Sequence, residues 1–389
     1  MYCKSIRVKN FRNIDEARVD FCEGVNILAG ENAQGKTNLL EAIFYASVGR
    51  SFRGASSAQM IGFGSESADI SLDFKDSKRE QNIHVRMFCD KNRIIEKNGI
   101  RVQRLSDIMG SFRAVLFCPE HLSLIKDGPA ERRSFLDMAI SRLYPMYIHS
   151  LQNYNNALKQ RNALLKAALT DRRTFEETVE LWNSQLAYEA SVISDMRVAF
   201  IKRAEKNIAR FFNEMMGEAE IPKVEYQGSL KQSEQEYSDR SQSEKKYLEL
   251  LSSAYDREIY AGSTLYGIHK DDIDITLNGK SARIYASQGQ QRSLALAMKL
   301  AEGEICREEF GDYPVFLFDD VLSELDLSRR DYLLNRMKGK QVIITTCEPD
   351  IIKNDIHAQK IFVHDGAYEK FLCGNEDSKC ISTLEITEI

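Results

Sequence analysis

At residues 30–37 the chain reads Gly30-Glu31-Asn32-Ala33-Gln34-Gly35-Lys36-Thr37, a match to the phosphate-binding pattern G-x-x-x-x-G-K-[ST]. An apolar run typical of a buried strand precedes it at residues 25–29, and an apolar helical pattern follows at residues 39–45. In such a loop backbone N–H groups face a phosphate, the lysine reaches the β- and γ-phosphates, and the hydroxyl binds Mg²⁺. We therefore predict that residues 30–37 form a nucleotide-binding P-loop, with Lys36 also acting in catalysis and Thr37 as a metal ligand.

The composition is that of an ordinary globular protein, since 43% of the 389 residues are hydrophobic and 29% are charged. A chain of this length can form a sizeable core and two lobes. No stretch reaches the roughly 18 apolar residues of a membrane-spanning helix. Residues 1–7 open into an alternating strand pattern without the core of a signal peptide. We therefore expect a cytoplasmic protein with no membrane partner.

The eight cysteines are scattered, with no C-x-x-C pair. This spacing favours reduced thiols over a zinc site or a disulfide framework.

A second element of phosphate chemistry lies far downstream, where the apolar run at residues 314–318 ends in Asp319 and Asp320. In P-loop enzymes a carboxylate at a strand end helps to hold Mg²⁺, and an adjacent acid can polarise the attacking water. We assign Asp319 to the metal and Asp320 to the water. The apolar run at residues 341–346 predicts another buried strand of the same parallel sheet.

The pattern along the chain changes from strands to helices. The first part reads as strands, and Asn98-Gly99 predicts a tight hairpin between the last two of them. From about residue 130 to 219 the period is helical, with one long amphipathic helix that carries Trp182 to Phe211 and a partner helix that carries Leu151 to Leu165. The long helix is too short for the coiled-coil arms of some P-loop ATPases. We interpret the polar residues 228–246 as a mobile loop and residues 373–389 as a flexible tail.

A small, hydroxyl-bearing turn, Ser287-Gln288-Gly289-Gln290, opens a strong helical pattern at residues 293–300. The start of a helix presents free N–H groups and a positive dipole end to an anion. A plain capped helix is the alternative reading of this segment.

This turn resembles the signature motif of ABC-type ATPases, and Ser323-Glu324-Leu325-Asp326 resembles their D-loop. Within that superfamily the chain resembles the RecF family of bacterial recombination-repair ATPases, which are related to the SMC proteins. The segments that carry this wider resemblance lie at residues 11–14, 50–53, 116–120, 128–133, 135–137 and 319–326. The chain departs from the family pattern at Ile268 and Lys270, where Pro and Arg are usual.

The resemblance implies an α/β fold, that of a P-loop NTPase of the ABC-ATPase type. Lobe I, with β-sheets around the P-loop helix, would comprise residues 1–125 and 265–372. Residues 126–264 would form a mainly helical lobe II.

The resemblance also implies a weak, DNA-dependent ATPase that uses ATP and Mg²⁺. Two copies would close head to head as a homodimer, each ATP lying between the P-loop of one copy and Ser287, Gly289 and Gln290 of the other. The dimer would clamp double-stranded DNA at gaps and at single-to-double-strand junctions, and slow hydrolysis would release it. Together with RecR and RecO it would help to load recombinase.

Charge alone does not identify a DNA surface, because the net charge is −5. Basic residues nevertheless gather near the start of the chain, and with the resemblance Arg7, Lys9 and Arg12 become candidate DNA contacts. Two alternatives stay open. One is an SMC-like structural DNA clamp without a repair-loading role, and the other is a metabolic P-loop kinase, which would lack a signature segment.

Overall fold

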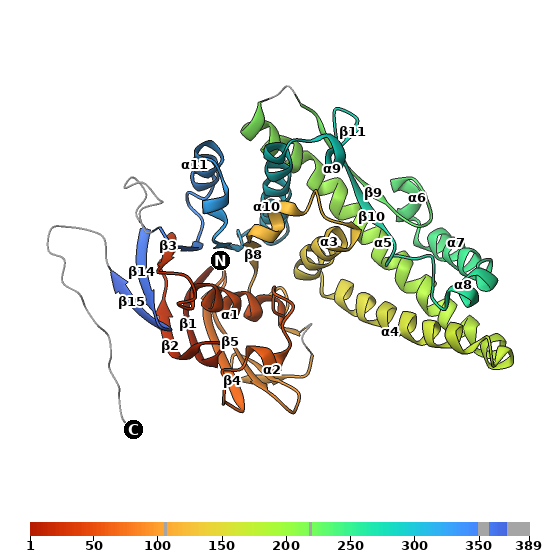
Figure 1. The fold of residues 1–389 in the computed structure, drawn as a ribbon, viewed down its shortest axis with the longest axis horizontal. Coiled ribbons are helices and arrows are strands. Elements are labelled where there is room, and N and C mark those ends of the chain that lie inside the picture. Colours follow the sequence, from red (N-terminus) through yellow and green to blue (C-terminus); the bar gives the residue numbers. More distant parts are fainter. Residues whose placement is uncertain (105–106, 218–219, 349–357, 372–389) are drawn as a thin grey trace. The chain divides into compact units, whose positions relative to one another are not determined.

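The P-loop belongs to the first of two units of the chain. A computed structural model describes residues 1–104, 107–217, 220–348 and 358–371 (Figure 1). Unit 1 comprises Met1–Leu122 and Glu302–Ile389, and unit 2 comprises Ser123–Ala301. The tail expected at residues 373–389 lies outside the described residues.

The central sheet of unit 1 carries both phosphate-chemistry elements. Its strands are β3 (Val25–Ala29), β8 (Ala114–Phe117), β12 (Val315–Asp319), β13 (Val342–Thr346), β14 (Ala358–His364) and β15 (Ala367–Phe371). They lie in the order β15-β14-β3-β13-β12-β8, and every pair is parallel except β14 with β15. The predicted strands before the P-loop, before the two acids and at residues 341–346 are therefore confirmed as members of one sheet. Strand β13 separates β3 from β12.

The helix that follows the P-loop, α1 (Lys36–Val48), lies between two sheets. It contacts β12 and β13 on one side and, on the other, two strands of a second sheet, β1 (Tyr2–Phe11) and β4 (Ser67–Lys75). All its residues from Leu39 to Val48 are buried, and most of them are apolar, as expected for a helix that is covered on every side. The P-loop is thus attached to a helix that is fixed over its whole length.

The second sheet of unit 1 is antiparallel. Its order is β2-β1-β4-β5-β6-β7, where the further strands are β2 (Ile14–Asp20), β5 (Glu80–Phe88), β6 (Ile94–Lys97) and β7 (Ile100–Val102). Buried and exposed residues alternate along β4 and β5, so one face packs inward and the other is polar. The hairpin predicted at Asn98-Gly99 is confirmed, since Lys97 pairs with Ile100 and both turn residues have positive φ. The described part of unit 1 also contains α2 (Ser57–Met60), α11 (Leu327–Arg336) and the last part of α10 (Gln288–Phe310).

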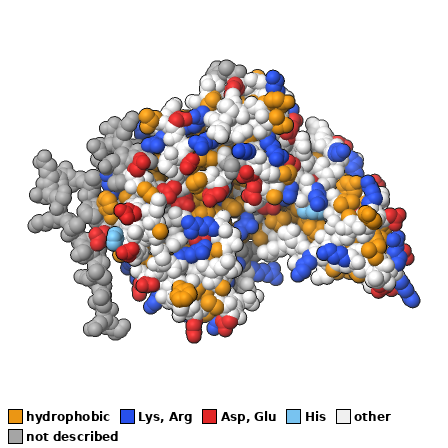
Figure 2. Space-filling model, in the orientation of Figure 1, with side chains coloured by type: hydrophobic (Ala, Val, Ile, Leu, Met, Phe, Trp, Pro, Cys, Tyr) orange, Lys and Arg blue, Asp and Glu red, His pale blue; other side chains and the backbone are white. Residues whose placement is uncertain are grey.

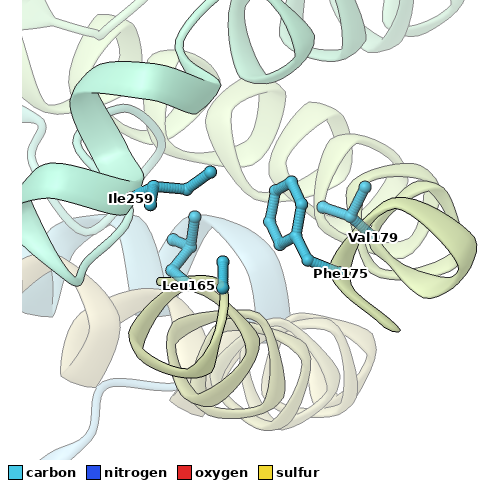
Figure 3. Close-up of a cluster of buried hydrophobic side chains, with 5 residues drawn as sticks. Leu165, Phe175, Val179 and Ile259 are labelled. Carbon is cyan, nitrogen blue, oxygen red and sulfur yellow. The ribbon is translucent and has the colours of Figure 1, made fainter. Parts of the chain in front are cut away.

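Unit 2 is mainly helical. Its helices are α3 (Pro129–Leu143), α4 (Pro145–Ala167), α5 (Arg172–Met216), α6 (Glu234–Ser238), α7 (Arg240–Ser252), α8 (Tyr255–Ala261), α9 (Ala282–Tyr285) and the first part of α10 (Gln288–Phe310). The long helix and its predicted partner are confirmed as α5 and α4, which pack against each other. Near their connection Leu165, Phe175, Val179 and Ile259 form a buried apolar cluster (Figure 3). No helix among the described residues is both long enough and apolar enough to cross a membrane.

A small antiparallel sheet of order β11-β10-β9 also belongs to unit 2, with β9 (Pro222–Gln227), β10 (Asp272–Leu277) and β11 (Lys280–Ser281). Because β10 pairs with β9, residues 265–301 pack within unit 2. The boundary expected at residue 265 therefore differs from the division in the structure, which falls inside α10.

The mobile loop expected at residues 228–246 is wrong, because α6 and most of α7 lie there. Ser233 and Glu236 form a capping box at the start of α6, which satisfies free N–H groups of the first turn. Tyr237 on α6 and Tyr247 on α7 are buried. Two aromatic side chains thus anchor a segment whose other residues are mostly polar.

The segment with the two departures from the family pattern is held by buried polar contacts in unit 2. The carbonyl of Ile268 accepts a hydrogen bond of 2.8 Å from Arg197, and Tyr154 contacts Nδ1 of His269 at 2.7 Å. Nε2 of His269 lies 3.1 Å from the carbonyl oxygen of Thr264. Since a carbonyl can only accept, Nε2 carries the proton and Nδ1 accepts from the tyrosine.

Candidate nucleotide site

The P-loop has the glycines that a phosphate cradle requires. A Cβ on Gly30 would lie 2.3 Å from the carbonyl oxygen of Val363, so no larger residue fits between β3 and β14. Gly35 has a φ of +110°, in the region that glycine adopts most readily. The Lys36 ammonium is buried and donates hydrogen bonds of 2.7 Å to the carbonyl oxygens of both Gly30 and Glu31. It therefore lies across the inside of the loop.

The predicted metal ligands meet at the start of α1. The Thr37 hydroxyl donates a hydrogen bond of 2.7 Å to Asp319, and Thr345 on the intervening strand donates one of 2.9 Å to the same carboxylate oxygen. Burial raises the pKa of Asp319 above its ordinary value, although these two hydrogen bonds lower it. The predicted pairing of Thr37 with the acid at the end of β12 is thus present as a direct contact.

Asp320 directly follows the last residue of β12. Its φ is +48°, and its backbone N–H donates a 3.0 Å hydrogen bond to the Thr345 hydroxyl. Burial raises the pKa of its carboxyl group, while the nearby Lys36 charge lowers it. A carboxylate with a raised pKa is a better proton acceptor at neutral pH than an exposed one.

A cavity of about 290 Å³ lies at the P-loop. Its lining includes the predicted residues Asn32, Ala33, Gly35, Lys36, Thr37 and Asp320, together with Asn13, Asn38 and Arg53. The last three were missed as site residues, although the segments around Asn13 and Arg53 carry part of the family resemblance. Gly30, Glu31 and Gln34 belong to the loop without lining the cavity. All residues of the lining come from unit 1.

Arg12, a predicted DNA contact, forms an ion pair inside unit 1. Its guanidinium donates to both carboxylate oxygens of Glu41 at 3.0 and 2.9 Å, and Glu41 is fully buried on α1. Ser51 also donates to this carboxylate. A buried carboxylate needs such partners, so Arg12 has a structural role beside the P-loop.

Arg7 and Lys9 lie on the polar face of the antiparallel sheet, and both are exposed. They line an open groove with Ser71, His84 and Arg86, and acids stand among them, for example Glu16 at 3.8 Å from Lys9. On the face of the molecule drawn in Figure 2, basic and acidic side chains are interspersed in the same way.

The predicted signature residues Ser287, Gly289 and Gln290 lie in unit 2, at the first turn of α10. The Ser287 hydroxyl accepts a 3.3 Å hydrogen bond from the Gln290 backbone N–H, and the Gln290 side chain accepts one of 2.6 Å from the Ser287 N–H. This reciprocal cap fixes the turn. The expectation that residue 287 precedes a helix is confirmed.

Known proteins are similar to this chain over most of its length. Residues 2–369 match the family described as the RecF/RecN/SMC N terminal domain. The DNA replication and repair protein RecF of Acetivibrio thermocellus is 35% identical over 93% of this chain and 98% of its own length. The protein of the same name from Thermoanaerobacter pseudethanolicus is 38% identical over 92% of this chain and 97% of its own.

Solved structures extend the comparison to the fold. The recombination mediator protein RecF with ATPrS in the RecFOR pathway has a TM-score of 0.89 and 34% identity, covering 95% of this chain and 98% of that one. RecF with ATP in the same pathway has a TM-score of 0.85 and 35% identity, covering 95% and 99%. The Smc head domain of Pyrococcus furiosus shares the fold at 18% identity, with a TM-score of 0.54 over 97% and 96% of the two chains. The α/β fold of ABC-ATPase type is therefore confirmed, and the chain belongs to the RecF family.

Proposed function

We propose that this chain is an ATP-dependent DNA-binding protein of recombination repair that closes as a dimer on DNA and opens when it hydrolyses ATP. The observation that carries the proposal is the contact between Thr37 and Asp319. It joins the end of the P-loop to the acid of β12, which is the arrangement that nucleotide hydrolysis needs.

The residues present fit ATP. Gly35 lines the P-loop cavity without a side chain, and Lys36 can exchange the carbonyl oxygens of Gly30 and Glu31 for phosphate oxygens. A lysine bonds more strongly to a charged phosphate than to a neutral carbonyl. The RecF proteins of known structure with bound ATP support the same ligand here.

The residues also fit Mg²⁺, because the Thr37 hydroxyl and the Asp319 carboxylate are hard oxygen ligands placed side by side. When bound, the metal supplies positive charge to the phosphates. Asp320 is then the group that accepts a proton from the attacking water, and its pKa, raised by burial, suits this role. Hydrolysis is slow in this proposal, and DNA stimulates it.

The second copy completes the site through Ser287, Gly289 and Gln290. The first turn of α10 offers an anion its helix N-terminus. A γ-phosphate that touches two copies stabilises only the closed dimer, so its loss removes the contact that held them together.

DNA is held through its backbone, since no motif of this chain reads bases. Arg7 and Lys9 are exposed and suited to phosphate contacts, whereas Arg12 is engaged by Glu41. The proposed targets are double-stranded DNA and single-to-double-strand junctions. Because the solved relatives are described as members of the RecFOR pathway, we include RecR and RecO as partners in loading recombinase.

Light scattering tests the dimer directly. The full chain is measured without nucleotide, with ADP and with a non-hydrolysable ATP analogue. We expect a monomer in the first two conditions and a dimer in the third. A monomer in all three conditions contradicts the proposal.

A further inference from the structure

The turn between β14 and β15 lies against the outside of the P-loop. Asp365 and Gly366 form a two-residue hairpin in which both residues have positive φ and His364 pairs with Ala367. Asp-Gly is a favoured sequence for such a turn. The Asp365 N–H donates to the side-chain oxygen of Gln34 at 2.5 Å, and the Gly366 N–H donates to the backbone carbonyl of Gln34 at 3.0 Å.

Tyr368, on β15, adds a third contact. Its hydroxyl donates a 3.1 Å hydrogen bond to the carbonyl of Gly35, which also accepts a 3.0 Å bond from Leu39 inside α1. The packing here is tight, because a Cβ on Gly35 would lie 3.3 Å from the Tyr368 hydroxyl, and one on Gly366 would lie 2.8 Å from the carbonyl oxygen of Asn13.

Asn13, in the turn between β1 and β2, contacts the P-loop as well. Its side-chain amide donates to the carbonyl of Ala33 at 3.2 Å, and its oxygen accepts from Asn38 on α1 at 2.7 Å. Residues from opposite ends of the chain thus bind three consecutive carbonyl groups, those of Ala33, Gln34 and Gly35.

These three contacts, together with the bond from Leu39 to the Gly35 carbonyl, constrain where the P-loop N–H groups point. A carbonyl and the next residue's N–H belong to one trans peptide plane and point in opposite directions. A carbonyl held outward by Asn13, Gly366 or Tyr368 therefore turns the following N–H inward. The three N–H groups fixed in this way are those of Gln34, Gly35 and Lys36, at the end of the loop where backbone amides bind nucleotide phosphates.

We infer that Tyr368 is a positioning residue of the nucleotide site, which acts through the Gly35 carbonyl to orient the P-loop amides. The β14–β15 hairpin is then part of the site, although none of its residues lines the P-loop cavity. This inference rests on the proposed function, since it assumes that the P-loop binds ATP.

The test is Tyr368→Phe, which removes only the hydroxyl. Losing one hydrogen bond of ordinary strength weakens binding about two- to tenfold. We expect the Kd for both ATP and ADP, measured by calorimetry on the full chain, to rise by that factor. The KM for ATP should rise in parallel while kcat at saturating ATP stays within about twofold, because Asp320 is untouched. A merely structural role would instead lower the melting temperature and the active fraction, and so kcat, with KM unchanged.

Tyr313→Phe is the matched control. Its hydroxyl donates a 3.1 Å hydrogen bond to Glu304, also in unit 1 but outside the nucleotide site, and we expect unchanged nucleotide affinity. If Tyr368→Phe does not fold, Tyr368→Met replaces it, because methionine is also a long apolar side chain and has no hydroxyl to donate to the Gly35 carbonyl. Wild-type affinity in either folded variant overturns the inference. A wild-type chain that binds no ATP overturns the proposed function itself.

Discussion

The hydroxyl of Thr37 and the carboxylate of Asp319, 282 positions apart in the sequence, share a hydrogen bond of 2.7 Å. Thr345, on the strand between them, bonds to the same carboxylate. The three side chains come from one loop and two neighbouring strands, so they hold the P-loop and β12 in a fixed relation. Because these residues belong to one site, we expect their substitutions to affect one reaction, each at the step in which that residue takes part.

Lys36→Met should weaken ATP binding while the fold stays intact. The ammonium loses a charge-assisted contact of about 1.5–3 kcal/mol, which corresponds to roughly tenfold to 150-fold in affinity. Calorimetric titration with ATP measures the loss, and circular dichroism checks the fold. Wild-type affinity in this variant would show that the P-loop assignment is wrong.

Substitutions of the two acids at the end of β12, Asp319 and Asp320, should have different effects. Asp320→Asn should still bind ATP and Mg²⁺ but hydrolyse ATP slowly, so that the dimer stays on DNA. Asp319→Asn should weaken the Mg²⁺-dependent part of nucleotide binding, because it removes the carboxylate beside Thr37. Phosphate release and binding titrations with and without Mg²⁺ distinguish the two. Normal turnover by Asp320→Asn excludes it as the group that activates water.

Ser287→Arg should bind ATP as a monomer but fail to dimerise. Its own P-loop is untouched, whereas the added bulk and charge lie where the partner's nucleotide would dock. Light scattering with a non-hydrolysable ATP analogue and a separate binding titration measure the two effects.

Mixing Ser287→Arg with Lys36→Met sharpens this test. A mixed dimer contains one composite site in which the P-loop and the signature are both intact, and one in which both are changed. Partial dimerisation or ATPase activity should therefore reappear although each parent lacks it. If Ser287→Arg dimerises normally, or if its monomer loses nucleotide binding, the segment does not act on a partner's nucleotide.

Reversal of Arg7 and Lys9 to Glu should lower the affinity for duplex DNA across unrelated sequences and reduce its dependence on salt, since fewer phosphates are neutralised. ATP binding by the monomer should not change. Arg172 and Arg173 reversed to Glu provide a control with the same change in net charge on unit 2. A larger loss of DNA affinity in that control than in the test variant would indicate that the DNA surface lies on unit 2.

Arg12→Glu should behave differently and destabilise unit 1, because it leaves Glu41 buried against a like charge.

His269 should make unit 2 less stable in acid. Burial lowers its pKa from the ordinary 6.5 to about 4, so between these values the unfolded chain binds a proton that the folded chain does not. The contribution of His269 to the free energy of unfolding should be constant above about pH 6.5 and fall by about 1.4 kcal/mol per pH unit down to about pH 4. Urea unfolding followed by Trp182, the single tryptophan and a residue of α5 in the same unit, measures this. In His269→Asn this part of the pH dependence should disappear. An equal slope in both proteins would assign the effect to other groups.

The parts of the site that the sequence predicts are those encoded locally. Residues 30–37 and Asp319-Asp320 each combine a buried strand with a short polar motif, so strand, turn and chemistry are all read from neighbouring residues. Asn13, Arg53 and Tyr368 could not be identified in this way. Each reaches the P-loop from a turn or strand elsewhere in the chain, and no periodicity specifies which turn packs against which loop. For the same reason the sequence did not indicate that β10 pairs with β9. Residues 265–301 therefore lie in unit 2, whereas the expected boundary was at residue 265. The helical turns within residues 228–246 were missed because the side chains buried there, Tyr237 and Ser243, form no apolar stripe.

The position of β3 in its sheet determines when the ATP site can form during protein synthesis. Both neighbours of β3, β13 and β14, are made from residues that follow it by more than 300 positions. At roughly 5–20 residues per second, a ribosome needs about 15–60 s to supply them. During that time the apolar strand and the loop attached to it have no sheet to join. Formation of the nucleotide site therefore waits for these residues, and a chain released before residue 342 lacks both strands that pair with β3.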